Sequence, residues 1–571
     1  MVSRTQDSMT VATPPLDQDM TAIFARREWL YVGAFILVVL ALTTLPFLFA
    51  YQSAPDDQQF MGIMVNVADH AQYFSWMRES RTQVLVPNQM TPESSTPLLF
   101  NFLWWTLGRI QNLTGMDYAG LFQITRWLAG AFVMVATYLF CAVVFQNRTK
   151  RWIAFLVGTL GGGVGWIWIV LKYLSPATIQ PSGANFTLFA SEPNTFFNVL
   201  AFPHFSIAAG LIAVIFTLVL LGQKSQNMRY AWAAAAVSLL LSVQHAYDMF
   251  IIYPVIGLYA LFIWTRDRKF PTYLFKLGVI VVLVSMWPAL QAFLITTADD
   301  VWRGVLSQFD NAGAWTPSPL LLPILMGFGW LLAIWALDIR TPWRKRDDTH
   351  LFIMAWFLSH FVLIYLPMNF QIHLLSGWQV VIGVLATIGL YTRVLPFLWR
   401  IFKNRSPQTL TRFAAAGLIL LVVPVNVYLF GWRFVDLRRA EAPYYMPTDT
   451  VAAYDYLETQ VASDDVVLSS LTVGQYVPML TGARAFLAHW AQTLDFYGKE
   501  NMVAAFFSVE TDDETRQDVL RQYSVDYVLF TPEEQALGAY DPADAPYLSE
   551  VFTQGDAVVY TVMLDEVALA R

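Results

Sequence analysis

Long apolar runs constrain this chain more than any other feature of its sequence. Segments of about 17 to 25 mostly apolar residues recur along its first three quarters, the length a helix needs to cross roughly 30 Å of hydrocarbon. Because 56% of the residues are hydrophobic and only 13% are charged, a soluble core does not account for these runs. The sequence predicts a polytopic α-helical membrane protein with about eleven spans, near residues 29–51, 122–145, 152–173, 198–221, 230–247, 249–264, 273–295, 319–338, 351–367, 375–399 and 412–432.

Lysine and arginine are unevenly divided between the two sides of the predicted membrane. If the spans alternate in direction, nineteen of these residues fall in the N-terminal tail and the loops of one side, and four in the loops of the other. The positive-inside rule places the richer side in the cytoplasm. The prediction is a cytoplasmic N-terminal tail (1–28), a multi-span domain (29–432) and an extracytoplasmic domain (433–571), all at the cell membrane.

The C-terminal domain is acidic and has a different pattern. From residue 440 onward the chain has 22 acidic residues against 5 basic ones, which argues against nucleic acid as a partner. Short helical and strand patterns alternate here, and residues 549–563 predict a hairpin with Gln554 and Gly555 near its turn. A small α/β domain with a partly parallel sheet is expected. The sequence has neither a GxGxxG nor a Walker motif, so nothing indicates a nucleotide site.

The first outer loop (52–121) is long enough to hold chemistry. Residues 60–81 repeat apolar and aromatic side chains at helical spacing, which predicts a helix lying on the membrane surface. Residues 97–113 are apolar enough to form a further span, but a crossing there would reverse the charge bias of every later loop. A juxtamembrane helix is therefore the preferred interpretation of residues 97–113.

Asp69 is the first candidate catalytic residue, on the helix predicted for residues 60–81. A spacing of four places Asp69 and Tyr73 on one face of this helix, and His70 is adjacent in the sequence. Partial desolvation at the interface would raise the pKa of the carboxyl group and suit it to accept a hydroxyl proton. The alternative is that these residues form the solvated face of an amphipathic helix.

Polar residues also gather at the outer ends of later spans. They are Glu192, Asn194, His204, His245, Asp248, Gln371 and His373. Polar groups at the rim of a span are costly to bury unless they are paired, so their clustering indicates a site. Helix capping is the alternative for Glu192 and Asn194, a tight turn for His245 and Asp248, and contact with a neighbouring helix for His373.

Sequence motifs leave metal binding open. Neither HExxH spacing nor a GxSxG nucleophile motif is present, although the fold could bring Asp69 and Glu192 together around a divalent metal. The single cysteine, Cys141, lies inside a predicted span and excludes a disulfide within the chain. Glycines at 161–163 and 165 fall in the third span, where small residues let helices approach closely or bend.

Several of these segments resemble the GT-C class of membrane glycosyltransferases. The resemblance rests on the outer-loop aspartate in DHAQY, on SEPNTF, FPHF and LPMNFQIHLLSGWQ, and on the C-terminal AHWAQTLDF and VDYVLF. The layout resembles the protein mannosyltransferase and lipid A aminoarabinose transferase branch. This resemblance implies an enzyme that moves a sugar from a polyprenyl-phosphate carrier to a lipid, glycan or protein acceptor on the extracytoplasmic face.

The resemblance also implies roles for individual residues. It assigns Asp69 as the catalytic base and Glu192 as a second carboxylate that shapes the acceptor or metal site. His70 stands where the mannosyltransferase motif commonly has a second acidic residue, and this departure leaves metal use and acceptor type open. An inverting transfer further needs groups that hold the departing phosphate. The candidates for that role are Arg78, Arg126, His204 and His373.

Two other functional classes fit the same sequence. A transporter also has many spans and embedded polar groups, although no inverted repeat is apparent and charged residues are scarce in the middle of the spans. A non-catalytic assembly protein would bind a partner through its acidic outer domain, with His489 and Trp490 as one binding element. Packing at the start of a helix is the alternative for that aromatic pair.

Overall fold

Helices dominate the chain, as the apolar runs predict. The computed structural model describes residues 26–174, 190–308, 315–337, 341–368 and 370–564. Within these ranges, five helices are long and apolar enough to cross a membrane, and up to seven spans result if each of two bent helix pairs counts as one. A multi-span membrane protein with a C-terminal mixed sheet is thereby confirmed, whereas the count of eleven spans stays a prediction.

The chain divides into two compact units, and each combines segments that are far apart in the sequence. The first unit comprises Met1–Thr43, Trp127–Met286 and Thr316–Leu429. The second comprises Thr44–Arg126, Trp287–Trp315 and Phe430–Arg571.

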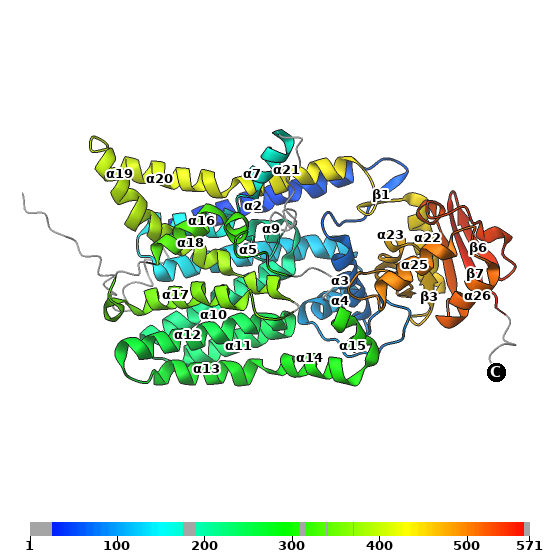
Figure 1. Cartoon of the computed structure of the whole chain (residues 1–571), viewed down its shortest axis with the longest axis horizontal. Coiled ribbons are helices and arrows are strands. Elements are labelled where there is room, and N and C mark those ends of the chain that lie inside the picture. Colours follow the sequence, from blue (N-terminus) through cyan, green and yellow to red (C-terminus); the bar gives the residue numbers. More distant parts are fainter. Residues whose placement is uncertain (1–25, 175–189, 309–314, 338–340, 369, 565–571) are drawn as a thin grey trace, which may run out of the picture. The chain divides into compact units, whose positions relative to one another are not determined.

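The first unit is a helical bundle around an apolar and aromatic core. Trp356 and Trp378 are fully buried in it. Helices α10, α11, α12 and α13 are neighbours, as Figure 1 shows. The elements with residues in this unit are α2 (Arg26–Gln52), α5 (Tyr118–Val144), α6 (Arg148–Leu160), α7 (Gly165–Leu174), α9 (Thr195–Ala201), α10 (Pro203–Ser225), α11 (Met228–Gln244), η1 (Ala246–Asp248), α12 (Met249–Asp267), α13 (Thr272–Ser285), α16 (Leu322–Ala336), η3 (Trp343–Lys345), α17 (Asp348–Leu363), η4 (Gln371–Leu375), α18 (Trp378–Gly389), η5 (Leu390–Val394), α19 (Leu395–Ile401), α20 (Pro407–Val422) and α21 (Pro424–Arg438).

The glycine run breaks the third predicted span. Helices α6 and α7 meet there at a bend of 52°. A Cβ atom on Gly163 would lie 2.3 Å from the carbonyl oxygen of Leu325, which is backbone and cannot rotate away. The freed amide of Gly162 donates to the carbonyl of Val422 at 2.9 Å. Both sequence interpretations of the run, close packing and a bend, therefore hold at this point.

The second unit combines the first outer loop with the C-terminal region. Its short antiparallel sheet joins Gln58–Phe60 (β1) to Tyr445–Pro447 (β2), strands that lie almost 390 positions apart in the chain. Its other elements are α3 (Val67–Glu79), α4 (Phe102–Thr114), α14 (Trp287–Ala298), α15 (Asp300–Ser307), α22 (Thr448–Gln460), β3 (Val466–Leu468), α23 (Leu471–Gly474), α24 (Val477–Leu480), β4 (Arg484–Ala485), α25 (Phe496–Phe506), α26 (Asp513–Gln522), β5 (Tyr527–Phe530), α27 (Pro532–Gln535), η6 (Pro542–Asp544), β6 (Leu548–Gln554) and β7 (Ala557–Val562).

The C-terminal sheet has the predicted partly parallel order. Its strands run β4-β3-β5-β7-β6, with β3 parallel to both β4 and β5 and the β6–β7 pair antiparallel. Gly555 has a φ of 52° in the β6–β7 turn, a backbone conformation that glycine adopts without penalty. The carboxyl ends of parallel strands meet at one edge, so the segments that follow β3, β4 and β5 leave from the same side of the sheet.

The first outer loop departs from its predicted form in one respect. The helix expected over residues 60–81 begins only at Val67, because residues up to Phe60 pair with β2 and Asn66 adopts a left-handed conformation. Half or more of α3 is buried, including His70. Helix α4 has 13 residues, so it is about 20 Å long and shorter than the hydrocarbon layer. The juxtamembrane interpretation of residues 97–113 stays a prediction.

Candidate active site

Asp69 lies in the first turn of α3, where both of its carboxylate oxygens are held. Asn66, the N-cap residue, has a φ of 48°, a left-handed conformation that asparagine tolerates better than most residues. Its side-chain amide donates to Asp69 Oδ2, and His489 Nε2 lies 2.9 Å from Asp69 Oδ1. The side chain is 26% exposed, so it remains accessible to a substrate. The helix N-terminus further favours a negative charge at this position.

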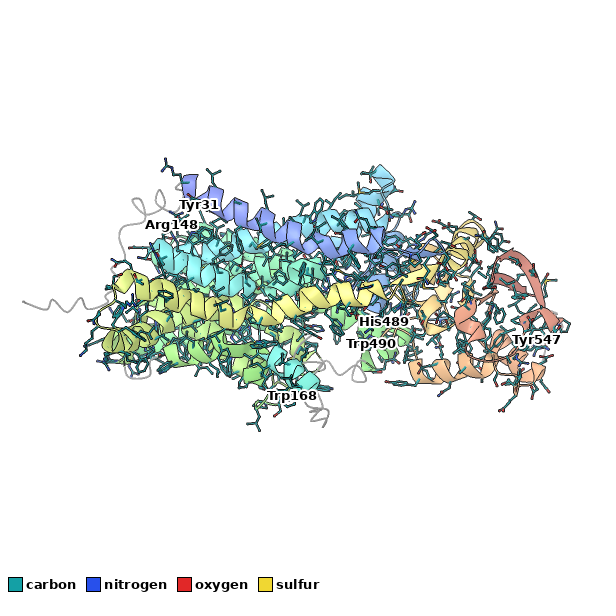
Figure 2. All side chains as sticks on the ribbon, turned by 90° about the horizontal axis from the view of Figure 1, so that it is seen from above. Tyr31, Arg148, Trp168, His489, Trp490 and Tyr547 are labelled. Atoms are coloured by element: carbon teal, nitrogen blue, oxygen red, sulfur yellow. The ribbon has the colours of Figure 1, made fainter. Side chains whose placement is uncertain are left out.

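His489 reaches Asp69 from the segment that follows β4, at the carboxyl edge of the parallel strands. Figure 2 shows His489 next to Trp490, and the two rings are 5.1 Å apart. The imidazole is almost fully buried, with 2% of its side chain exposed. Its Nδ1 accepts a hydrogen bond from the backbone amide of Ala491 at 3.0 Å. Sequence reasoning singled out His489 for partner binding and missed its contact with Asp69.

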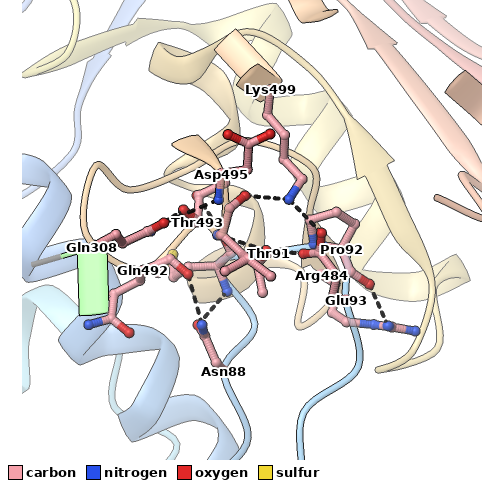
Figure 3. A network of polar contacts seen from close by, with 12 residues as sticks. Asn88, Thr91, Pro92, Glu93, Gln308, Arg484, Gln492, Thr493, Asp495 and Lys499 are labelled. Atoms are coloured by element: carbon pink, nitrogen blue, oxygen red, sulfur yellow. Dashed lines mark hydrogen bonds and ion pairs between the residues drawn. The ribbon is translucent and has the colours of Figure 1, made fainter. Parts of the chain in front are cut away.

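A polar network fixes the loop that carries His489 (Figure 3). The amine of Lys499 is fully buried and pairs with Glu93 of the first outer loop at 2.6 Å. The Asn88 side chain donates to the carbonyl of Gln492 at 2.8 Å. Gln308, which follows α15, donates to the carbonyl of Thr493. The second unit thus holds residues 488–499 from two separate parts of the chain, the first outer loop and the segment after α15.

Hydrogen bonds outweigh burial in setting the pKa of Asp69. Burial alone would raise the pKa of its carboxyl group. The hydrogen bond from His489 lowers the pKa most. Electrostatic attraction by His489 and His70 and a hydrogen bond from Asn66 add to it, so the pKa lies below its ordinary value. This direction is opposite to the raised pKa expected from the sequence, because sequence reasoning included desolvation and no donors. The carboxylate is ionised at neutral pH and ready to accept a proton.

His70 and Tyr73 pack around the same end of α3. His70 Nδ1 lies 2.9 Å from the carbonyl oxygen of Asn66, so the ring supports the turn that presents Asp69. Tyr73 stacks on Trp104 of α4 with ring centroids 4.9 Å apart. Both residues lie on α3, where the spacing of four puts Tyr73 on the same helix face as Asp69; their role in a site stays a prediction.

The two arginines proposed for phosphate binding have different surroundings. Arg78 donates to the carbonyls of Leu480 and Thr481 at 2.8 and 3.1 Å and pairs with Glu458 at 2.9 Å. These contacts tie α3 to the C-terminal region. Arg126 is fully buried within α5, where it donates to the Thr44 hydroxyl at 2.8 Å and its guanidinium lies 5.0 Å from the Phe47 ring.

A second polar group lies in the first unit and collects five residues from three segments. His373 of η4 lies 2.8 Å from Glu192, which precedes α9, at ion-pair distance between Nδ1 and Oε1. The His373 ring stacks on Tyr247 with centroids 4.8 Å apart. The Tyr247 hydroxyl bonds to His245 Nε2, and His245 Nδ1 lies 2.7 Å from Asp248 Oδ2. We call these five residues the histidine cluster.

Each histidine of the histidine cluster lies next to a buried carboxylate. Glu192 and Asp248 are both buried, with 7% and 0% of their side chains exposed. Burial would raise the pKa of Glu192, but the contact with His373 outweighs it and brings that pKa below its ordinary value. Both ring nitrogens of His245 are engaged. His373 is 19% exposed, and within the described residues its Nε2 makes no hydrogen bond, so this nitrogen is available to a ligand.

The remaining predicted site residues of the first unit lie near this cluster or cap helices beside it. The His204 ring is 6.3 Å from the His245 ring. Asn194 caps α9 by accepting from Phe197, as the capping alternative predicts, and donates to Asn426 at 2.7 Å. Gln371 donates to the carbonyl of Leu366 at 2.6 Å, which fixes the segment before His373.

Asp69 belongs to the second unit and Glu192 to the first, and each carboxylate is bound by side chains of its own unit. In the ranges that the structure describes, no group of three or more His, Cys, Asp or Glu side chains is arranged to hold a metal ion. Asp69 is satisfied by two nitrogen donors, and Glu192 by a histidine and the Ser191 hydroxyl.

The fold is similar to that of solved GT-C glycosyltransferases over most of the chain. The apo oligosaccharyltransferase of Archaeoglobus fulgidus has a TM-score of 0.56 at 13% identity, over 91% of this chain and 73% of that chain. Archaeal AglB from the same organism, in complex with an inhibitory peptide and a dolichol-phosphate, has a TM-score of 0.52 at 13% identity, over 94% and 75%. ArnT from Cupriavidus metallidurans, bound to undecaprenyl phosphate, has a TM-score of 0.51 at 12% identity, over 94% and 99%.

These likenesses confirm the GT-C-like fold that the sequence motifs predict. No protein-family model and no curated protein matches the chain. Identity is 13% or less in these three matches, so the functional roles of individual residues rest on the geometry above.

Proposed function

We propose that this chain is a membrane glycosyltransferase that moves a sugar from a polyprenyl-phosphate donor to a hydroxyl acceptor, with Asp69 as the general base. The observation that carries the proposal is an accessible, ionised carboxylate held by two donors in a chain of GT-C-like fold. Solved structures of that fold include one bound to undecaprenyl phosphate and one in complex with a dolichol-phosphate. The acceptor is a lipid, a glycan or a protein.

The reaction needs a base at the acceptor and a group that takes the leaving charge. The acceptor oxygen forms a bond to the anomeric carbon as its proton passes to Asp69, and the bond from that carbon to the phosphate oxygen breaks. The polyprenyl phosphate departs with the electron pair. Attack and departure on opposite faces of the sugar invert the anomeric centre. Asp69 suits the first role because an ionised carboxylate accepts a proton, and its two donors leave further lone pairs for the acceptor hydroxyl.

The first unit holds a separate group suited to an anionic phosphate, the histidine cluster. Glu192 Oε1 lies 2.8 Å from His373 Nδ1, which leaves Nε2 of this ring to donate to an anionic oxygen. Asp248 orients His245 in the same way, and His245 in turn fixes the Tyr247 hydroxyl. Glu192 therefore acts through His373 in this proposal.

The proposal includes the topology predicted from charge. Eleven crossings with a cytoplasmic N-terminus place the first outer loop and residues 433–571 on the extracytoplasmic face. A polyprenyl-phosphate donor is confined to the bilayer, so a base on the first outer loop is close to the membrane surface where the donor's sugar lies. The site then needs no nucleotide sugar, which agrees with the lack of a nucleotide motif in the sequence.

Reconstitution with a labelled donor tests the function. The purified chain is placed in liposomes with a polyprenyl-phosphate sugar, and release of polyprenyl phosphate is followed together with sugar transfer to added acceptor. Asp69→Asn should lower kcat at least 100-fold, the usual contribution of a general base. Asp300→Asn is the matched control, because Asp300 is 90% exposed and pairs with Arg303 on the surface of α15.

Two outcomes would contradict the proposal. Equal turnover of wild type and a folded Asp69→Asn variant would remove Asp69 as the base. Movement of the lipid or sugar across sealed vesicles, with no sugar transferred, would indicate the transporter that the sequence alone leaves open. Loss of activity in Asp300→Asn as well would show that the assay reports folding and not chemistry.

A further inference from the structure

The contact between Asp69 and His489 joins two residues 420 positions apart in the chain. Both belong to the second unit. We infer that His489 is a positioning residue for the transfer reaction: its imidazole holds the carboxylate of Asp69 in the orientation that accepts the proton of the acceptor. The inference rests on the proposed function and adds a residue to it that acts through Asp69 and does not touch the reacting atoms.

The backbone determines which nitrogen of His489 carries a proton. The amide N–H of Ala491 points at Nδ1 from 3.0 Å, so Nδ1 must offer a lone pair. A neutral imidazole has one N–H, which then lies on Nε2 and donates to Asp69 Oδ1 at 2.9 Å. Protonation of Nδ1 would set two N–H groups against each other. His489 Nε2 is therefore the donor to Asp69, and His489 is not the proton acceptor of the reaction.

The loop around His489 is built to keep this geometry. The hydroxyl of Thr493 accepts from the amides of Ala488 and His489 at 3.1 and 3.0 Å, and it donates to the carbonyl of Met90 at 2.6 Å. One side chain thus anchors the backbone at His489 to the first outer loop, which also carries Asp69. With 2% of its side chain exposed, His489 has little freedom to rotate.

Other groups that face Asp69 cannot replace this contact. Asn66 binds the second oxygen, Oδ2, from the same helix turn, and His70 directs its Nδ1 at the Asn66 carbonyl. Without His489, the Oδ1 side of the carboxylate loses its donor and the side chain can turn about its Asn66 contact. A displacement of about 1 Å in a reacting group can lower a rate about 100-fold.

Two substitutions at position 489 separate positioning from structure. Glutamine can place an amide nitrogen where Nε2 lies, so His489→Gln keeps the donor to Asp69. Asparagine can place an oxygen where Nδ1 lies, so His489→Asn keeps the acceptor for the Ala491 amide but is too short to reach Asp69. If His489 only supported the loop, His489→Asn would be the milder change. If it positions the base, His489→Gln is the milder change.

The experiment uses the full chain in liposomes with a polyprenyl-phosphate sugar and saturating acceptor. His489→Asn should lower kcat roughly 10- to 100-fold, the value of a hydrogen bond to a charged group, while KM for the donor is unchanged. His489→Gln should retain most of the wild-type kcat. In an Asp69→Asn background, His489→Asn should cause no further loss, because the two residues act as one unit.

The outcomes distinguish this inference from the proposed function. An active Asp69→Asn variant would overturn the proposed base and the inference with it. An inactive Asp69→Asn variant with equal kcat for His489→Asn and His489→Gln would overturn the inference alone. Thermal melting of each variant in detergent controls for folding, and if His489→Asn is unfolded, loss of kcat in a folded His489→Gln variant would also overturn the positioning role.

Discussion

Thr493 offers a direct test of how the second unit holds its candidate base. Replacing it by valine preserves the size of the side chain and removes the hydroxyl. That hydroxyl is fully buried and takes part in three hydrogen bonds, from the amides of Ala488 and His489 and to the carbonyl of Met90. In Thr493→Val, two buried N–H groups and one carbonyl lose their partner.

The cost follows from those three contacts. A buried polar group left without a partner costs about 1 to 3 kcal/mol, and neighbouring losses add less than fully, so we expect about 2 to 4 kcal/mol of local destabilisation for Thr493→Val. A change of about 1.4 kcal/mol is tenfold in an equilibrium constant, so hydrogen exchange at the amides of Ala488 and His489 should accelerate roughly 30-fold or more. Because His489 is displaced, kcat should fall as well.

Hydrogen exchange followed by mass spectrometry of peptides spanning residues 486–494 measures this effect in detergent-solubilised protein. Thr392→Val is the matched control, since the hydroxyl of Thr392 is exposed and donates within its own helix to Ile388 at 2.8 Å. Unchanged exchange in the 486–494 peptides of Thr493→Val would refute the argument that this hydroxyl fixes the loop. Equal acceleration in Thr392→Val would show a general effect of removing threonine hydroxyls.

Three further predictions concern other parts of the structure. Gly163→Ala should lower the melting temperature, because the added carbon would lie 2.3 Å from a backbone oxygen. Gly257→Ala is the control and should not lower it, because nothing lies within 4 Å of the added carbon. Equal melting temperatures of the two variants would contradict this account of the bend. Asn66→Gly keeps the left-handed turn but removes a donor to Asp69, which raises the pKa of that carboxyl group. Since activity needs the ionised form, the acidic limb of the pH–rate profile should move to higher pH, and an unmoved limb would contradict the role of Asn66. The pKa of Glu192 is lowered in the folded protein, so its ion pair with His373 stabilises the fold at pH values above the unfolded pKa of about 4.3. This stabilisation is lost as the pH falls through the folded pKa. The difference in melting temperature between wild type and Glu192→Gln should therefore shrink over that pH range, and a constant difference would count against the ion pair.

Local patterns in the sequence predict local structure well in this chain. The pattern of residues 549–563 predicts the β6–β7 hairpin, because a hairpin depends on the period of its own side chains and on its turn. Local patterns do not predict where the helices in the apolar runs break. The bend between α6 and α7 depends on how closely Gly163 approaches Leu325, a contact between distant segments that no window of sequence contains.

The sequence predicts which residues belong to the candidate site, but not which of them contact one another. The sequence draws attention to Asp69 and to the polar residues at span ends, and the structure joins Glu192 to His373 and His245 to Asp248. The sequence alone cannot pair His489 with Asp69, because the two residues are 420 positions apart and no periodic pattern links them. The expected direction of the Asp69 pKa differed for the same reason, because the donor that lowers it comes from elsewhere in the chain.

The C-terminal region contacts the first outer loop through specific side chains. Lys499 is fully buried and pairs with Glu93, and Arg78 donates to the carbonyls of Leu480 and Thr481. Removing Glu93 would leave the buried amine of Lys499 without its ion-pair partner, which is destabilising, so this pair helps to hold the two segments together. The C-terminal region is therefore part of the scaffold that holds Asp69, and changes in its acidic surface should leave the base in place while changes near residues 488–499 displace it.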